Sequence, residues 1–208
     1  MLLVIETATA ALSVALFDGE RVVAAHHEIV GRGHAERLLP VIADMLGANV
    51  LGQRRPTAIA VDCGPGSFTG VRVGLAAAQG LRIAWQVPVS GFSSLSLVAA
   101  QVDENGSVAV ALSGGHGEVF AQMFETSPLR PTDTMRSLAP ADAAKALVAA
   151  RIFGSGAAAV VAARGWGEAV DTLPRASDFN KLPDALAALP LRPIYGRAPD
   201  AKPSMRTP

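Results

Sequence analysis

The stretch from Gly64 to Gly74, which reads GPGSFTGVRVG, constrains the fold more than any other part of the chain. It follows an apolar run at 58–62 that is typical of a buried strand, and it leads into a segment with apolar residues at helical spacing. Glycines permit positive φ angles or close approach to another backbone, and a proline fixes φ between the first two of them. Ser67 or Thr69 can cap the helix that follows. The sequence therefore predicts a tight turn from a strand into a helix.

This loop admits two interpretations. In the first, free backbone N–H groups and the positive end of the helix dipole bind an anion such as a nucleotide phosphate. In the second, the loop is a tight turn that holds no ligand. The loop lacks both the Lys-Ser/Thr ending of a P-loop and the GxGxxG spacing of a dinucleotide fold. Its spacing alone therefore leaves both interpretations open.

The composition of the chain limits the functions that this loop could have. The chain has 208 residues, half of them hydrophobic, and a formal net charge of zero. These values support a sizeable core and offer no basic surface for nucleic acid, so any contact with tRNA or DNA would be local or indirect. The single cysteine, Cys63, allows no intrachain disulfide and fits a reducing cytoplasm. Because Cys63 follows an apolar strand, we expect a buried structural thiol.

No segment predicts insertion into a membrane. The longest uncharged apolar runs, such as residues 157–163, are much shorter than the roughly 20 residues that a spanning helix needs. The N-terminus enters an alternating strand pattern directly, without the charged and apolar regions of a signal peptide. We therefore expect a cytoplasmic protein with no membrane partner.

The first hundred residues alternate between strand and helix patterns. Three short apolar stretches, with a hairpin signal at Asp18-Gly19, predict three antiparallel strands. The apolar spacing then changes to the helical period, and the two patterns alternate. The expected elements are strands at 2–7, 11–18 and 21–29, a helix at 34–47, a strand at 58–62, a helix at 70–86, a strand at 87–91 and a helix at 93–101.

The second half repeats this plan in a shorter form. A polar break at 103–107 marks a candidate domain boundary. Beyond it we expect a hairpin of strands at 107–114 and 118–125, a helix at 140–150, a strand at 151–156 and a helix at 183–189. The sequence thus predicts an N-terminal lobe at 1–102, a smaller C-terminal lobe at 103–198 and a disordered tail at 199–208.

Two related β-β-β-α-β-α lobes, the second shortened, are the plan of the α/β fold of the actin-like ATPase superfamily (ASKHA, RNase H-like), in which nucleotide lies between the lobes. Beyond topology, five segments are distinctive: IETATAALSVAL at 5–16, HAERLLP at 34–40, GPGSFTGVRVGLAAAQGLRIA at 64–84, HGEVF at 116–120 and PIYGR at 193–197. Together they resemble the TsaB (YeaZ) family, closely over the first 125 residues and loosely from 126 to 190.

The resemblance implies a non-catalytic subunit of the machinery that forms N6-threonylcarbamoyladenosine at position 37 of tRNAs that read codons beginning with A. In that family TsaB pairs with its paralogue TsaD, which transfers the threonylcarbamoyl group, and TsaE joins as an ATPase. TsaD holds a metal with an HxxxH pair, whereas this chain has His34 and Leu38 at the matching positions. The resemblance therefore implies no metal site and no catalytic residue here, and it argues against a metallopeptidase.

Comparison with the TsaB family pattern also argues against a nucleotide site. ATP-handling members of the superfamily place an acid at the end of the first strand, where it reaches Mg²⁺ through water. The family commonly reads D-T-A-T there, but this chain has Glu6 before Thr7. We expect no nucleotide on the protein alone, and ATP with Mg²⁺ only in the complex. The candidate contacts for a nucleotide or anion are Glu6, Thr7, Gly66, Ser67, Thr69 and Arg72.

The two predicted helices of the first lobe carry more apolar and small residues than a single buried face requires. Either all of these residues pack on the sheet, or some meet a partner helix at close range. The resemblance favours a heterodimer with TsaD, a homodimer when TsaD is absent, and contact with tRNA only through the complex. The candidate interface residues are His34, Leu38, Ile42, Met45, Gly74, Leu75, Ala78 and Arg82.

The alternative function is a free-standing actin-fold, ATP-dependent phosphotransferase or hydrolase that uses the cleft. Ser113 and His116 could suggest a hydrolase, but a hairpin turn explains the segment SGGHG better, and no acid is placed to orient the histidine. The missing HxxxH pair and the glutamate at position 6 favour the scaffold.

Overall fold

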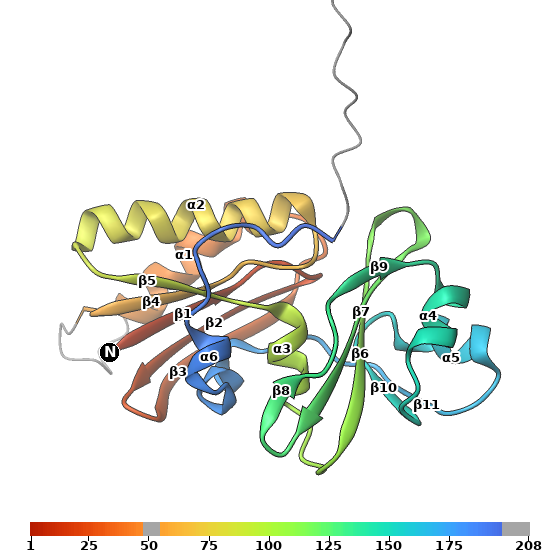
Figure 1. Ribbon diagram of the computed structural model, residues 1–208. Coiled ribbons are helices and arrows are strands. Elements are labelled where there is room, and N and C mark those ends of the chain that lie inside the picture. The colour runs from red at the N-terminus through yellow and green to blue at the C-terminus, as the bar shows by residue number, and fades with distance from the viewer. Residues whose placement is uncertain (48–54, 197–208) are drawn as a thin grey trace, which may run out of the picture.

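The computed structural model describes residues 1–47 and 55–196. Two lobes, each built on a mixed sheet, lie side by side (Figure 1). The predicted disordered tail at 199–208 lies outside the described residues. None of the described helices is long and apolar enough to cross a membrane.

The first lobe is built on a five-stranded sheet in the order β3-β2-β1-β4-β5. Its strands are β1 (Leu2–Glu6), β2 (Ala11–Asp18), β3 (Arg21–Ile29), β4 (Ala58–Asp62) and β5 (Val89–Phe92). The first three strands pair antiparallel, as the hairpin signal predicts, while β4 pairs parallel with both β1 and β5. A parallel pair needs a crossover, and the helix between β4 and β5 supplies it.

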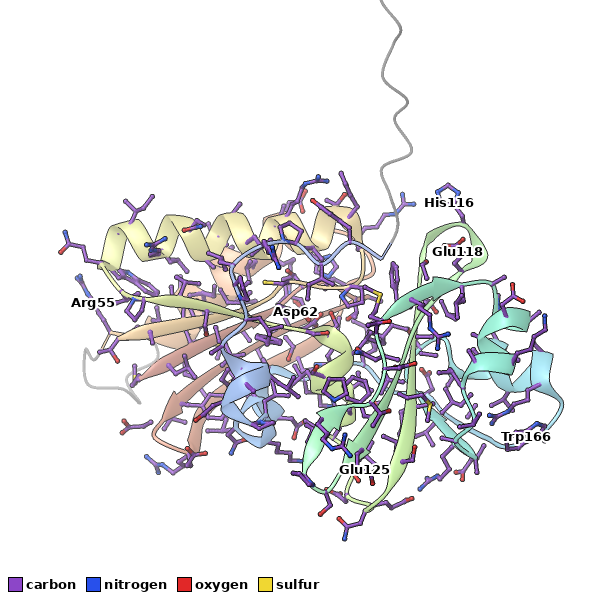
Figure 2. All side chains as sticks on the ribbon, in the orientation of Figure 1. Arg55, Asp62, His116, Glu118, Glu125 and Trp166 are labelled. Carbon is purple, nitrogen blue, oxygen red and sulfur yellow. The ribbon has the colours of Figure 1, made fainter. Side chains whose placement is uncertain are left out.

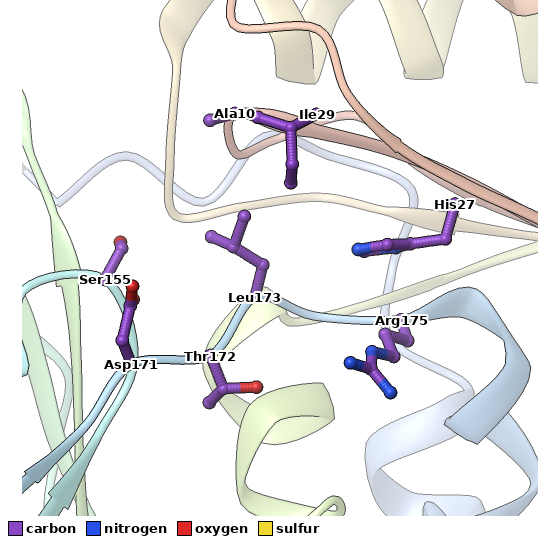
Figure 3. A pocket seen from close by; sticks show the side chains of 8 residues that line it. All are labelled: Ala10, His27, Ile29, Ser155, Asp171, Thr172, Leu173 and Arg175. Carbon is purple, nitrogen blue, oxygen red and sulfur yellow. The ribbon is translucent and has the colours of Figure 1, made fainter.

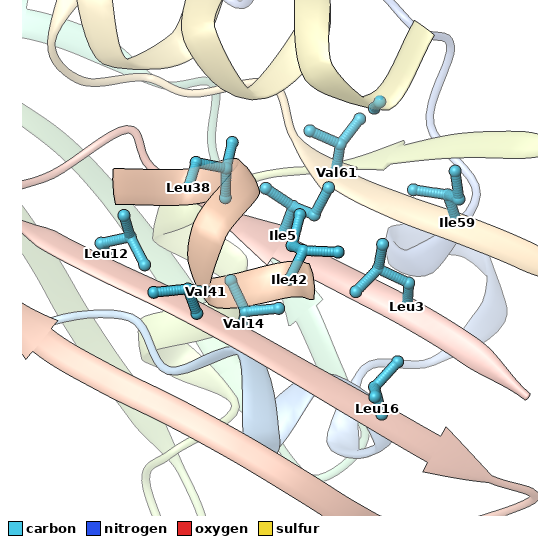
Figure 4. Close-up of a cluster of buried hydrophobic side chains, with 11 residues drawn as sticks. Leu3, Ile5, Leu12, Val14, Leu16, Leu38, Val41, Ile42, Ile59 and Val61 are labelled. Carbon is cyan, nitrogen blue, oxygen red and sulfur yellow. The ribbon is translucent and has the colours of Figure 1, made fainter. Parts of the chain in front are cut away.

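Two helices cover one face of this sheet: α1 (His34–Gly47) and α2 (Phe68–Trp85). Alternate strand residues such as Leu3, Ile5 and Val14 point toward these helices and pack against Leu38 and Ile42 (Figure 4). The period of two along the strands and the helical period of the covering segments thus meet in one buried cluster. Pro40 lies inside α1, and the helix continues through it.

The opposite face of the first sheet is covered by the returning C-terminal segment. This segment contains the 3-10 helix η3 (Ala176–Lys181) and the short helix α6 (Asp184–Ala187). Phe179 packs edge-on against Phe92, with ring centroids 5.2 Å apart, in a cluster with Val4 and Phe17. The assignment of all of residues 103–198 to the second lobe is therefore wrong for this segment, which belongs to the core of the first.

The second lobe repeats the first in the order of its strands. Its six-stranded sheet runs β11-β10-β6-β7-β8, with β9 paired to β7. Position for position, β6, β7, β8, β10 and β11 take the places of β1, β2, β3, β4 and β5. The strands are β6 (Ser107–Ser113), β7 (Val119–Thr126), β8 (Leu129–Pro131), β9 (Arg136–Leu138), β10 (Arg151–Phe153) and β11 (Glu168–Val170).

Three helices and a turn complete the architecture. The helix α3 (Ser94–Ala99) lies between the lobes and packs its Leu95 and Val98 against β6, while α4 (Pro140–Ala146) and α5 (Ala157–Arg164) cover the second sheet. The 3-10 turn η2 (Gly115–Gly117) closes the β6–β7 hairpin. The predicted helix at 140–150 ends four residues early, and β8, β9, α5 and β11 were not predicted. The two related lobes confirm the α/β fold of the actin-like type.

Candidate functional site

The glycines of the 64–74 loop are needed for close packing against the turn that follows β1. A side chain at Gly66 would collide with the carbonyl oxygen of Ala8, and one at Gly70 would collide with that of Thr7. The hydroxyl of Thr7 donates to the carbonyl oxygen of Gly70 over 2.8 Å. Only residues without a Cβ allow the two backbones to approach this closely.

Three backbone N–H groups of this turn have partners within the protein. Ser67 N donates to Ala8 O over 2.6 Å, and the side chain of Ser67 caps α2 by accepting from Gly70 N over 3.2 Å. Gly64 N donates to Asp62 Oδ1 over 2.6 Å. These bonds consume donors that a bound anion would need, so the turn is chiefly a structural joint between β4 and α2.

Two fully buried carboxyl groups lie beneath the turn, at the carboxyl ends of the paired strands β1 and β4. Figure 2 shows Asp62 inside the first lobe, below α2. Burial raises the pKa of Asp62 to about 7, and burial followed by repulsion from Asp62 raises the pKa of Glu6 well above its usual value. Glu6 Oε1 accepts hydrogen bonds from Ala8 N and Thr9 N. Raised pKa values favour the neutral, protonated forms of both carboxyl groups, whose charge would otherwise be buried.

The predicted nucleotide contacts are therefore not assembled as a set. Glu6 and Thr7 are fully buried and bonded to neighbouring backbone, so neither side chain faces an open site. Gly66 packs on Ala8 and Ser67 caps the helix, while Thr69 is exposed at the first turn of α2. The structure brings these residues to one turn but gives most of them structural roles.

Arg72, the last of these predicted contacts, joins an exposed aromatic stack. Its guanidinium carbon lies 3.2 Å from the centre of the Phe68 ring and 5.6 Å from that of Tyr195. Ile194 N donates to Cys63 O over 2.7 Å, which holds the returning segment against the loop. This hydrogen bond explains why residues 193–196 and the glycine loop, which are far apart in sequence, are in contact in the fold.

Cys63 and His34 both have structural roles. The prediction that Cys63 is a buried thiol is confirmed, and burial together with Asp62 raises its pKa to about 11. Nε2 of His34 lies 2.9 Å from the carbonyl oxygen of Ala11, which fixes the start of α1 to β2. Ser113, at the end of β6 in the second lobe, donates its hydroxyl to Ser155 O, and His116 lies at the tip of the β6–β7 hairpin (Figure 2).

The structure corrects most of the predicted partner interface. Five of those residues are buried within the subunit and cannot meet a partner from the folded surface. Met45 and Leu75 are half-buried, and Arg82 is exposed. The physical reason is the orientation of each helix about its own axis. The face that packs on the sheet contains the residues that the sequence suggested for a partner. The buried five are His34, Leu38, Ile42, Gly74 and Ala78.

A different set of apolar and small residues faces outward from the same two helices. Ile83 is 78% exposed and Leu39 is 51% exposed, both high fractions for large apolar side chains. Alanines and a glycine extend this pattern along each helix at spacings of three and four, which places them on one face. We call this set the two-helix surface: Ala35, Leu39 and Ala43 of α1 with Ala76, Gly80 and Ile83 of α2.

Gly80 gives this surface a second distinctive feature. A glycine inside a helix costs about 1 kcal/mol relative to alanine. No atom lies within 4 Å of the position that a Cβ on Gly80 would take, so nothing described in this subunit requires a glycine there. The sequence does contain a signal for this surface, because each helix carries apolar residues on a second face. The sequence alone does not say which of the two faces packs on the sheet.

Comparisons with known proteins agree with this architecture. The family model described as "TsaD: tRNA N6-adenosine threonylcarbamoyltransferase" matches residues 24–145. The chain is 40% identical over 122 residues to the tRNA threonylcarbamoyladenosine biosynthesis protein TsaB of Escherichia coli, which covers 57% of this chain and 52% of that protein. The chain thus spans about half the length of that curated relative.

Two matches extend over nearly the whole chain. An uncharacterized protein of Mycobacterium tuberculosis is 32% identical over 211 residues, covering 97% of this chain and 93% of the other. The solved structure of YeaZ from Pseudomonas aeruginosa superposes with a TM-score of 0.76 at 30% identity, covering 93% of this chain and 98% of that one. Together with the motifs and the two-lobed fold, these matches show that the chain belongs to the TsaB (YeaZ) family, a paralogue of the TsaD family.

Proposed function

We propose that this chain is a cytoplasmic subunit of the machinery that forms N6-threonylcarbamoyladenosine at position 37 of tRNA, and that it acts by binding TsaD. The proposal rests on family membership and on one structural observation, the exposed two-helix surface. In this role the chain supports TsaD and carries out no chemistry of its own. TsaE and tRNA join through the complex, and ATP with Mg²⁺ is handled there.

The two-helix surface has the composition of a protein interface. Large apolar side chains at Leu39 and Ile83 offer area to bury, and the small residues between them allow another helix to approach closely. Because TsaD is a paralogue, we expect it to carry an equivalent pair of helices that packs against this pair. A second copy of this chain would present the same face, which explains a homodimer when TsaD is absent.

Co-elution with TsaD from the same organism tests the proposal, with Ile83→Glu as the diagnostic variant. Ile83 is 78% exposed, so the substitution leaves the folded subunit intact. In the complex it would bury an unpaired carboxylate within the interface, which costs about 3 kcal/mol and weakens binding about 100-fold. Isothermal titration of TsaD into each variant measures this change.

Val148→Glu is the matched control, since Val148 is 73% exposed on the second lobe and lies outside the two-helix surface. It should bind TsaD as the unmodified chain does. Equal binding by both variants would show that another surface is used. Ala78→Arg, the variant that the sequence alone suggests, is unsuitable because Ala78 is fully buried and the charge would unfold the subunit.

A turnover assay without partners separates the scaffold from the alternative enzyme. The alternative is a free-standing ATP-dependent phosphotransferase or hydrolase, which would hydrolyse ATP alone at a rate on the order of 1 s⁻¹ or faster. Such turnover together with no binding to TsaD would refute the proposal. The scaffold predicts no turnover alone and full restoration of tRNA modification when the chain is added to TsaD and TsaE.

A further inference from the structure

A cavity of about 400 Å³ lies between the two lobes, away from the two-helix surface. The first lobe contributes His27 and Ile29 from β3, and the second contributes Ser155 from the turn between β10 and α5 (Figure 3). Asp171 and Arg175 come from the segment that crosses from β11 back to η3. This volume is within the range of small-molecule sites, and the proposed scaffold role leaves it unused.

Opposite charges line the two ends of this cavity. Arg175 and His27 lie at one end, and Asp171 lies beside Ser155 at the other (Figure 3). Within residues 1–47 and 55–196, the side chains of Arg175 and Asp171 form no ion pair or hydrogen bond. A cation and an anion that line one cavity without pairing to each other are available to a ligand that carries both charges.

The middle of the cavity is apolar. Leu173 projects between the two charged ends, and Ile29 lies opposite it (Figure 3). Ile29 is 65% exposed, a high fraction for an isoleucine at the end of a strand. A ligand with a short hydrocarbon spacer would cover both side chains.

The walls of the cavity are held in place by hydrogen bonds. Thr172 Oγ1 donates to Gln101 Oε1 over 3.0 Å, and Gln101 Nε2 donates to Leu173 O over 3.1 Å. On the second lobe, Ser155 Oγ accepts from Ser113 N over 3.1 Å, which leaves the hydroxyl proton of Ser155 free to donate. Such support fixes the walls before a ligand arrives and so lowers the entropic cost of binding.

We propose that this cavity binds a small zwitterion whose anionic group pairs with Arg175 and His27 and whose ammonium group pairs with Asp171. Leu173 and Ile29 pack against the spacer between the two charges, and the hydroxyl of Ser155 donates to a polar atom at the ammonium end. The ligand thereby bridges the two lobes. Neither half of such a molecule alone satisfies both ends of the cavity.

The pKa of the His27 imidazole indicates whether the anionic group of a ligand is bound beside Arg175. Burial, the charge of Arg175 and the neighbouring His26 lower the pKa of His27. A bound anion between His27 and Arg175 favours the imidazolium form and raises this pKa. Because the chain has only four histidines, NMR titration of the ring protons resolves His27, and loss of its signal in His27→Gln assigns it.

The test titrates the full chain, without TsaD, with 4-aminobutyrate and 6-aminohexanoate as zwitterions and with butyrate, butylamine and inorganic phosphate as single charges. We expect at least one zwitterion to bind tenfold or more tightly than each single charge and to raise the pKa of His27. Arg175→Gln should lower the affinity for that zwitterion at least tenfold. Asp171→Asn should lower the affinity for the zwitterion without changing the affinity for butyrate. Arg130→Gln, an exposed arginine on β8, should change nothing.

Three results would overturn this proposal: no binding by any zwitterion, binding of butyrate or phosphate as tight as that of the zwitterions, or unchanged binding in Arg175→Gln. Each of these results leaves the interaction with TsaD untouched, because the cavity and the two-helix surface share no residue. Failure of this inference and failure of the scaffold proposal are therefore distinguishable.

Discussion

The two lobes contain equivalent turns from a strand into a helix, and the two turns differ in what covers them. In the first lobe, residues 63–67 join β4 to α2; in the second, residues 154–156 join β10 to α5. Both turns use glycine to approach a neighbouring strand. Gly66 packs on Ala8 after β1, and Gly154 packs on Ala111 of β6, the strand that takes the place of β1.

The first turn is closed and the second is open. The first covers the buried acids Glu6 and Asp62, and its serine, Ser67, caps an 18-residue helix. The second carries an exposed serine, Ser155, that lines the cavity between the lobes and caps no helix, since α5 has no side-chain cap. The same local pattern therefore serves as a structural joint in one lobe and as a cavity wall in the other.

This difference shows that a glycine-rich turn does not define a site by itself. Its backbone geometry is local, but whether its donors face solvent depends on the strand packed against it. In the first lobe that neighbour ends in a buried acid, and Gly66 and Gly70 pack against the residues that follow it. A ligand site needs a cavity as well as glycine, and the exposed Ser155 of the second turn lines one.

The largest expected effect comes from adding a side chain at Gly66, where the first turn packs against Ala8. A Cβ in Gly66→Ala would collide with the backbone of Ala8, which has no flexible side chain to move aside. We expect a loss of more than about 4 kcal/mol in the free energy of unfolding, or failure to fold. Urea denaturation followed by circular dichroism measures it.

Gly80→Ala is the control for that variant, because a Cβ on Gly80 meets no atom within 4 Å. It should raise the free energy of unfolding by up to about 1 kcal/mol. If Gly66→Ala were as stable as Gly80→Ala, the tight closure of the first turn would not be what holds β4 and α2 against β1.

The buried acids make the first turn sensitive to pH. Burial raises the pKa of Asp62 in the folded chain to about 7, above the ordinary value of 3.8 that applies when unfolded. The folded state therefore binds more protons between these values, and stability falls as pH rises through this window. We expect the unmodified chain to lose on the order of 2 kcal/mol in the free energy of unfolding between pH 5 and pH 8.

Asp62→Asn tests the cause of this pH dependence. The amide oxygen can still accept from Gly64 N and from the hydroxyl of Ser94, so the turn keeps its bonds without a charge. The variant should show a smaller decline from pH 5 to pH 8 and should exceed the unmodified chain in stability at pH 8. Urea titrations at the two pH values measure both quantities. An unchanged slope would mean that Asp62 stays ionised when folded.

The sequence predicted the first lobe well because its elements are long and carry clear periods. The strands at 11–18 and 21–29 have the predicted bounds. The second lobe was predicted less completely. Strands β8, β9 and β11 have three residues each, too few to show a period, and they depend on pairing with β7 or β10.

The second lobe and the site were harder to predict for three physical reasons. A run such as AAAVVAAR has no alternation, so its helix α5 follows from its position over the second sheet. The return of residues 176–187 to the first lobe rests on contacts between residues more than 100 positions apart in sequence, such as Ala176 N with Ser13 Oγ. The partner residues were misplaced by register alone, because small and apolar residues on two faces of α1 and α2 leave the buried face undetermined.

The smallest expected effect compares the two serines directly. Ser67→Ala removes the cap of α2, whose side chain accepts from Gly70 N, and should lower the free energy of unfolding by about 1 kcal/mol. Ser155→Ala removes an exposed bond from Ser113 N and caps nothing, so it should cost less than about 0.5 kcal/mol. For zwitterion binding the order reverses, because Ser155 lines the cavity and Ser67 does not. Equal effects of the two variants on both stability and binding would mean that the turns are interchangeable, and the distinction between a closed joint and an open wall would then have to be abandoned.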